Sequence, residues 1–329
     1  MWRARWWIAL QLGGLGCAGP PEIEPADLGD VDSDSDSGGG GGGGSGSGSD
    51  GPISPLGPWI GVSAGERNSC GLSSTGAIAC WGEIFYGVVD QAPAAVGHTE
   101  VVTGWDYACA LDADARVGCW GDDLQRIVSE PPVAPTAALS AGTFHACALS
   151  LDGQAGCWGS EVDGKLRVPP GNTWLAIAAG RRHSCGIRAD GGLSCWGAPG
   201  PWLDGPGADA TGPWSRVDTG DGLTCGIRAS DGSIACWGAG PAVDPPGGGG
   251  FTDLSVGPGG HACAVDASAT IVCWGEVPAG QPQLQEGGWA RVSAGGAHTC
   301  GLADGGAIHC WGDDSSGQSS GSWAAGAGL

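Results

Sequence analysis

Charged residues and helical patterns are scarce in this chain of 329 residues. Asp, Glu, Lys and Arg together make up only 15% of the sequence, whereas glycine occurs 68 times. No segment after residue 20 shows a convincing amphipathic helical pattern. Glycine disfavours helices, so this composition indicates many short strands joined by turns.

Basic residues are few, and their shortage argues against two kinds of partner. The formal net charge is −22, and residues 51–329 hold 27 acids against 11 Lys and Arg. An acidic body repels the phosphates of nucleic acids and the surfaces of anionic membranes. We therefore expect no nucleic-acid partner, and membrane contact only through a lipid anchor.

Long hydrophobic runs are also missing. The apolar stretch from Trp6 to Leu15 is too short to span a bilayer, but it follows Arg3 and Arg5 and precedes small residues. A basic start, a short apolar segment and small residues are typical of a signal peptide, which we assign to residues 1–16.

The end of this segment, Gly14-Leu15-Gly16-Cys17, resembles a bacterial lipoprotein signal. The resemblance implies that a lipid is attached to Cys17. Because Leu15 lies one place closer to the cysteine than is usual, an ordinary cleaved signal ending near Ala18 stays open. Both alternatives export the chain, either to the cell envelope as an outer-membrane or periplasm-facing lipoprotein or into the medium.

Residues 17–57 hold the cysteine and an acidic, Gly/Ser-rich stretch that includes seven consecutive glycines. Such a segment has little to bury, so we expect a disordered tether. The alternation of Asp32, Asp34 and Asp36 lacks the glycine and the distal glutamate of a calcium loop, which favours solvated disorder over a metal site.

The residues Cys-Trp-Gly recur seven times at intervals of 37 to 41 residues. Their tryptophans are Trp81, Trp120, Trp158, Trp196, Trp237, Trp274 and Trp311. A near-constant period of this size is the sequence signature of a repeat architecture.

Each Cys-Trp-Gly copy has a second cysteine ten or eleven residues upstream. A three-residue hairpin loop such as Leu151-Asp152-Gly153 places Cys147 directly opposite Cys157, where a cross-strand disulfide can form. The fifth pair is one residue further apart and predicts a longer turn. The predicted disulfides are Cys70-Cys80, Cys109-Cys119, Cys147-Cys157, Cys185-Cys195, Cys225-Cys236, Cys263-Cys273 and Cys300-Cys310.

A third stretch of each repeat ends in glycine after an aliphatic residue, as in Val62-Ser63-Ala64-Gly65. Both faces of the hairpins are apolar or small, and the last repeat has no polar capping version. An open solenoid needs caps and a ring does not. We therefore predict an all-β, seven-bladed β-propeller over residues 58–329, with one hairpin disulfide in each blade.

The recurring text, as in SAGTFHACALSLDGQAGCWG (140–159) and VSAGGAHTCGLADGGAIHCWG (292–312), resembles the regulator of chromosome condensation repeat. It is most similar to the short-repeat bacterial branch that includes the β-lactamase-inhibitory propeller. The resemblance implies a ring closed by pairing strands from the two chain ends. The family's tract after Trp-Gly, usually Asn-x-x-Gly-Gln-Leu-Gly, is eroded here, with Gly317-Gln318 and Gly164-Lys165-Leu166 as its remnants.

Two chemical motifs are better explained by the repeat than by a site. Gly61-Val62-Ser63-Ala64-Gly65 matches a nucleophile elbow, but its equivalents recur without the strand–turn–helix setting that an elbow needs. Histidines precede the first cysteine by two residues in four repeats, at His145, His183, His261 and His298. Other repeats have Asn, Tyr or Leu there, and oxidised cysteines do not bind zinc, so packing or hydrogen-bonding histidines are favoured.

Acidic residues follow Trp-Gly in five repeats, where they would ring one end of the propeller. They are Glu83, Asp122, Asp123, Glu161, Glu276, Asp313 and Asp314. They are either solvated turn residues or an acidic rim that favours a basic protein partner. Phe85, Tyr86 and Trp202 are either interface anchors or packed aromatics.

From these observations we expect a monomeric, exported, lipid-anchored module that binds an unknown protein at the cell envelope, with no catalytic residues, metal or cofactor. The alternatives are an envelope enzyme with its site at the channel, and a purely structural envelope role. A guanine-nucleotide-exchange regulator, as implied by the family resemblance, fits poorly with an exported acidic chain.

Overall fold

The computed structural model describes residues 58–205 and 212–320, all of which belong to one compact unit. They form seven antiparallel sheets, each built from one repeat of the sequence. Two single-turn 3-10 helices, η1 (Val162–Gly164) and η3 (Pro241–Val243), are the only helices in these ranges. The prediction of an all-β, seven-bladed propeller is confirmed.

The strands of the blades are as follows. Blades 1 to 3 consist of β1 (Trp59–Ala64), β2 (Asn68–Ser73) and β3 (Ile78–Gly82); β4 (Glu100–Thr103), β5 (Tyr107–Leu111) and β6 (Val117–Gly121); and β7 (Thr136–Ala141), β8 (His145–Ser150) and β9 (Ala155–Gly159). Blades 4 and 5 consist of β10 (Trp174–Ala179), β11 (His183–Arg188) and β12 (Leu193–Gly197); and β13 (Trp214–Thr219), β14 (Leu223–Arg228) and β15 (Ile234–Gly238). Blades 6 and 7 consist of β16 (Asp253–Val256), β17 (His261–Val265), β18 (Ile271–Gly275) and β19 (Leu284–Gln285); and β20 (Trp289–Ala294), β21 (His298–Ala303) and β22 (Ile308–Gly312).

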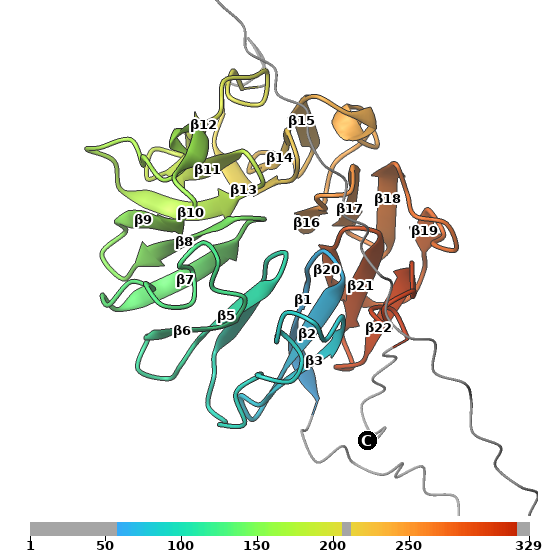
Figure 1. Ribbon diagram of the computed structural model, residues 1–329. Helices are drawn as coiled ribbons and strands as arrows, with labels where there is room; N and C mark the ends of the chain where they lie inside the picture. Colours follow the sequence, from blue (N-terminus) through green and yellow to red (C-terminus); the bar gives the residue numbers. More distant parts are fainter. Residues whose placement is uncertain (1–57, 206–211, 321–329) are drawn as a thin grey trace, which may run out of the picture. The chain divides into compact units, whose positions relative to one another are not determined.

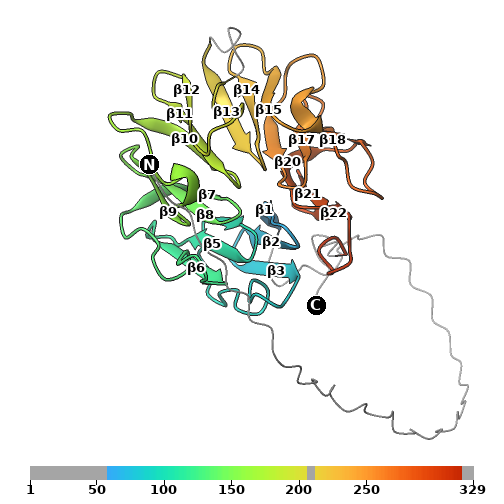
Figure 2. The ribbon, with the colours of Figure 1, turned by 45° about the horizontal axis from the view of Figure 1, so that its top comes forward.

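The blades follow one another around a closed ring. The first strands of neighbouring blades contact each other in order, and β20 of blade 7 contacts β1 of blade 1. Figures 1 and 2 show blades 1 and 7, in blue and red, side by side. The expected closure by strands from both chain ends is wrong for the described residues: β1 pairs with β2, and β20 to β22 form their own sheet. Each repeat supplies all the strands of its own blade, so side-chain and backbone contacts close the ring.

The tryptophan of each Cys-Trp-Gly copy is a wedge between blades. The Trp120 indole N–H donates to the Val88 carbonyl, at 2.8 Å, and the Trp196 indole N–H donates to that of Lys165, at 2.9 Å. At the seam, the Trp81 indole N–H donates to Gln318 O at 3.0 Å, so the segment after blade 7 closes on blade 1. The Gly317-Gln318 remnant therefore has a structural role.

Seven glycines, one after each first strand, line the inner turns of the ring. A Cβ atom added to Gly142 would meet the carbonyl oxygen of Gly180, and the same relation links each glycine to the next. The series runs through Gly65, Gly104, Gly142, Gly180, Gly220, Gly257 and Gly295 and returns to Gly65. Only glycine leaves room for the close approach of the blades at these seven positions.

Each blade holds one hairpin disulfide, as predicted, with Cα atoms of the paired cysteines 4.0–4.1 Å apart. Such short distances are typical of non-hydrogen-bonded cross-strand pairs. The longer turn predicted for blade 5 is present, since Arg228 N donates to Ser233 O, five residues on, whereas Ser150 N donates to Gln154 O, four residues on.

The signal peptide, Cys17 and the tether of residues 17–57 lie outside the described residues. Within 58–205 and 212–320, no helix has the length and apolar character needed to cross a membrane.

Candidate binding surface

One side of the ring carries the turn after each first strand, and the acids predicted from the sequence lie beside these turns. The Glu83 amide donates to the carbonyl of Arg67 at 2.9 Å, that of Asp122 to Asp106 at 2.8 Å, and that of Asp313 to Ala297 at 2.7 Å. We call this side the glycine face, because the seven inner glycines begin its turns. The seven predicted acids all follow third strands that end on this face.

The seven acids differ in what their carboxylates do. Asp123 accepts hydrogen bonds from the amides of Val128 and Ser129, and Asp314 accepts them from Ser319 and Ser320. Hydrogen bonds from Ser129 lower the pKa of Asp123 below its usual value. These two acids hold their own connections in place.

Three of the other rim acids also have partners. Glu83 pairs with Arg67 at 3.3 Å, and Glu161 lies 3.7 Å from Arg167. Asp313 accepts hydrogen bonds from the amide and hydroxyl of Ser315 and from Gln318 Nε2. The side chains of Asp122 and Glu276 make no hydrogen bond or ion pair among the described residues, so they are the rim carboxylates most available to a partner.

The rim is interrupted at blades 4 and 5, where Ala198 and Ala239 take the place of acids. The adjacent turn carries Arg181 and Arg182, each 3.0 Å from a carboxylate oxygen of Asp221. The Arg181 guanidinium also lies 5.6 Å from the ring of Trp105. These arginines are engaged with Asp221 and an aromatic ring.

Exposed apolar side chains alternate with the acids over blades 1 to 3. Phe85, Leu124 and Val162 are 85%, 79% and 63% exposed. Each lies three residues before the buried residue that follows its blade, namely Val88, Ile127 or Lys165. The residue directly before each buried residue has a positive φ in all three turns. These residues are Gly87, Arg126 and Gly164. The three side chains therefore occupy one repeat position, a relation that counting back from Gly87-Val88 and Gly164-Lys165 could have revealed from the sequence.

The sequence left the roles of three aromatics open, and the structure separates them. Phe85 and Tyr86 are exposed, whereas Trp202 is buried. The Trp202 ring stacks at 5.9 Å from that of His183, and its carbonyl accepts the Trp237 indole N–H at 2.9 Å. Trp202 is therefore a packing residue, because blade 4 uses it where blades 1 and 2 use Val88 and Ile127.

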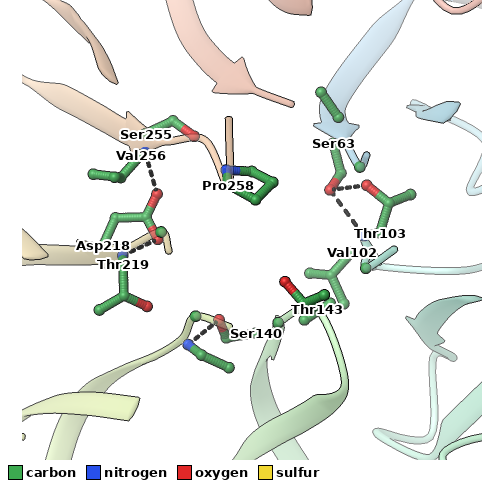
Figure 3. A pocket seen from close by; sticks show the side chains of 18 of the residues that line it. Ser63, Val102, Thr103, Ser140, Thr143, Asp218, Thr219, Ser255, Val256 and Pro258 are labelled. Atoms are coloured by element: carbon green, nitrogen blue, oxygen red, sulfur yellow. Dashed lines mark hydrogen bonds between the residues drawn. The ribbon is translucent and has the colours of Figure 1, made fainter. Parts of the chain in front are cut away.

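The central channel encloses a cavity of about 160 Å³. Several of its polar side chains, among them Ser63, Ser140 and Asp218 in Figure 3, bind the next blade. Ser140 Oγ accepts the Ala179 amide at 2.9 Å, Ser293 Oγ accepts that of Ala64 at 2.8 Å, and Asp218 accepts that of Val256 at 2.7 Å. Burial raises the pKa of Asp218 to about 6. The serines of the elbow-like motif thus act as hydrogen-bond acceptors between blades.

The four repeated histidines are buried and bind the following blade. Their Nε2 atoms lie 2.7–2.9 Å from the hydroxyls of Ser184, Thr224, Thr299 and Ser69. Burial lowers the pKa of His145 to about 3 and those of His183, His261 and His298 to about 4. The described residues contain no group of three His, Cys, Asp or Glu that could hold a metal ion. The hydrogen-bonding interpretation of these histidines agrees with this geometry.

Comparison with known proteins identifies the repeat. The regulator of chromosome condensation (RCC1) repeat matches residues 174–200 and 289–318. No curated protein matches the chain. The matched segments are the first to third strands of blades 4 and 7, with the tract that follows each.

Solved structures with this fold include two plant receptor ectodomains. The ectodomain of the Physcomitrella patens receptor kinase CR4 is 24% identical, with a TM-score of 0.66, over 78% of this chain and 74% of that one. The CRINKLY WD40 ectodomain of Arabidopsis thaliana ACR4 is 20% identical, with a TM-score of 0.61, over 78% and 98%. Prp20p of Saccharomyces cerevisiae is 15% identical, with a TM-score of 0.57, over 72% and 80%. The chain shares the propeller fold of these structures.

Proposed function

We propose that this chain is an exported propeller that binds a basic protein through the rim of its glycine face. The observation that carries the proposal is the alternation of acids with exposed Phe85, Leu124 and Val162 over blades 1 to 3. Apolar side chains supply contact area, and rim charges steer a partner of opposite sign. The structural neighbour Prp20p, described with its binding to Gsp1p and histones, supports a protein-binding role for this fold.

Export and anchoring belong to the same proposal. Seven disulfides suit an oxidising compartment outside the cytoplasm. A lipid on Cys17 and a tether of about 40 residues, spanning roughly 35 Å, would hold a monomeric propeller close to the membrane. We place the chain nearest the short-repeat bacterial branch with the β-lactamase-inhibitory propeller. Labelling with a radioactive fatty acid, with Cys17→Ser as control, tests the anchor: a signal that survives the substitution excludes Cys17.

The rim is tested by reversing the charges of Asp122 and Glu276, whose side chains make no hydrogen bond or ion pair among the described residues. We expect Asp122→Lys/Glu276→Lys to fold normally and to lose most of the basic proteins that wild type captures from envelope extracts. Since exposed charges are screened by salt, wild-type capture should fall between low and moderate ionic strength. Affinity capture with mass-spectrometric identification measures both effects.

The matched control lies on the opposite face, on and beside the hairpin of blade 7. Glu286→Lys/Asp304→Lys changes the net charge by the same amount at exposed positions, and its capture should equal that of wild type. Equal capture by both double variants would exclude the rim, and equal loss in both would show that only the net charge matters.

A further inference from the structure

Four blades fill the same internal slot with a tryptophan at the start of the first strand. In blades 1, 4, 5 and 7, the indoles of Trp59, Trp174, Trp214 and Trp289 are buried. Each lies so close over a glycine of its own second strand that a Cβ there would be 2.5–2.9 Å from the ring, at Gly71, Gly186, Gly226 and Gly301. Phe251 is the buried counterpart in blade 6.

The recurring Cys-Trp-Gly tryptophan forms a second wall of this slot. The ring centroids of Trp174 and Trp196 are 5.4 Å apart, those of Trp214 and Trp237 are 5.9 Å apart, and those of Trp289 and Trp311 are 5.1 Å apart. The slot therefore has the shape and chemistry of an indole site, bounded by one aromatic ring and a small residue.

Blade 2 keeps the walls of the slot but lacks its indole. His98 lies three residues before Val101, as Trp59 lies before Val62. The His98 Nδ1 atom is 3.1 Å from the carbonyl oxygen of Gly76, so the imidazole is directed toward the hairpin of blade 1. A side chain of this size and direction leaves the space over Ala110 open.

The structure shows a cavity in this place. It measures about 460 Å³ and is lined by Trp120, Ala110 and Gly118 of blade 2 and by Gln91 and Pro93 of the preceding connection. A Cβ atom at Gly118 would meet nothing within 4 Å. Cavities of about 300–1,000 Å³ with apolar walls and a few polar groups are typical of binding sites.

We propose that this slot, bounded by His98, Ala110, Gly118 and Trp120, binds an aromatic anchor side chain, a tryptophan by preference, presented by a partner protein. The occupant follows from the chain itself, because the equivalent position holds Trp in four other blades and Phe in a fifth, whereas blade 3 has the smaller Thr136. Buried tryptophans are prominent among the residues that dominate protein interfaces. Polar groups of His98, Gln91, Asp112 and Arg116 line the same cavity and can bind the main chain on either side of the anchor. This site is additional to the acidic rim.

The probe is the tripeptide Ac-Gly-Trp-Gly-NH2, observed by saturation-transfer NMR with the exported protein. We expect transfer to its indole protons and none to Ac-Gly-Ala-Gly-NH2. His98→Trp introduces the indole that blades 1, 4, 5 and 7 have at this position, so it should abolish the transfer and raise the Tm. Gly118→Leu extends a side chain into open space and should abolish the transfer by a second route.

Gly156→Leu in blade 3 is the matched control, because a Cβ there also meets nothing within 4 Å, and it should leave the transfer unchanged. No transfer to the tryptophan peptide in wild type, or undiminished transfer in both filled variants, would overturn the proposal. Transfer to free indole but not to the tripeptide would also overturn it, in favour of a small-molecule site. Asp122→Lys/Glu276→Lys should not affect the tripeptide, so failure of the rim and failure of the slot are separate results.

Discussion

The inner turns and the outer connections of this propeller follow different rules. At the inner turns, all seven glycines make the same close approach to the next blade. In the outer connections, one repeat position holds Phe85, Leu124 or Val162, and the number of residues between blades changes. Inner residues are constrained by contacts with both neighbouring blades, whereas outer residues are mainly exposed to solvent. The comparison indicates that the inner turns specify a ring of seven and that differences between blades, which a partner can recognise, lie outside it.

The largest expected effect concerns the disulfides, which link the inner and outer parts of each blade. A loop of about 11 residues closed by a disulfide contributes roughly 2.5–3 kcal/mol in the chain-entropy model. Seven together rival the usual net stability of a domain, about 5–15 kcal/mol. We therefore expect full reduction to unfold the protein at room temperature, measured as loss of near-ultraviolet circular dichroism from its tryptophans.

Partial reduction sharpens this prediction. Cys263 and Cys273 are both buried, whereas the second cysteine of every other pair is half-buried. Under mild reductant, alkylation followed by mass analysis should find Cys263–Cys273 among the last disulfides to open. Early alkylation of this pair, or a native circular dichroism spectrum after full reduction, would contradict the assigned role.

The inner part of the molecule could be predicted from the sequence, because its contacts constrain residue types. Cysteine offsets fixed the hairpin register, and seven uncapped copies indicated a ring. The eroded tract was harder to interpret. The Trp120 and Trp158 indoles need only a backbone carbonyl, from Val88 and Ile127, so the geometry persists while the side chains vary.

The binding features could be predicted only in part. Rim acids were found because a charge after Trp-Gly is visible in the sequence, but their local hydrogen bonds depend on the path of each connection. Trp202 could not be classified, since it lies one residue closer to its Cys-Trp-Gly copy than Val88 and Ile127 lie to theirs, so the repeat spacing does not align them. The slot beside His98 was not foreseen, because it is defined by the absence of the aromatic side chain that five other blades have at this position.

The next prediction concerns the buried histidines of the inner part and the effect of acid on stability. Burial lowers the pKa of His183 to about 4, so between pH 6.5 and 4 this histidine is protonated in the unfolded chain and neutral in the folded one. The stability that the neutral, buried imidazole contributes is complete above pH 6.5 and is lost as the pH falls to 4. Replacing it by Asn, the residue blade 1 has at Asn68, should remove about 3 kcal/mol of the stability loss between pH 7 and 4.

Urea unfolding at several pH values measures this effect. Half-buried Glu100, whose pKa is raised by desolvation to about 7, changes stability in the opposite direction, since the folded chain holds its proton between pH 4.5 and 7. The test therefore compares His183→Asn with wild type rather than reading one profile alone. Parallel pH profiles for the two proteins would show that this histidine is not buried in its neutral form.

The smallest effect directly compares two glycines. In Gly142→Ala, the new Cβ would press on the carbonyl oxygen of Gly180, and an overpacked site of this kind costs about 1–3 kcal/mol. Gly118→Ala on β6 places the same methyl in open space, and because it restricts the unfolded chain it should stabilise the fold by about 0.4–1 kcal/mol. Denaturant midpoints at constant m measure both changes. Opposite signs would confirm that ring closure, and not glycine content as such, sets the need for glycine at the inner turns; equal destabilisation would mean that the outer strand is as tightly constrained as the ring.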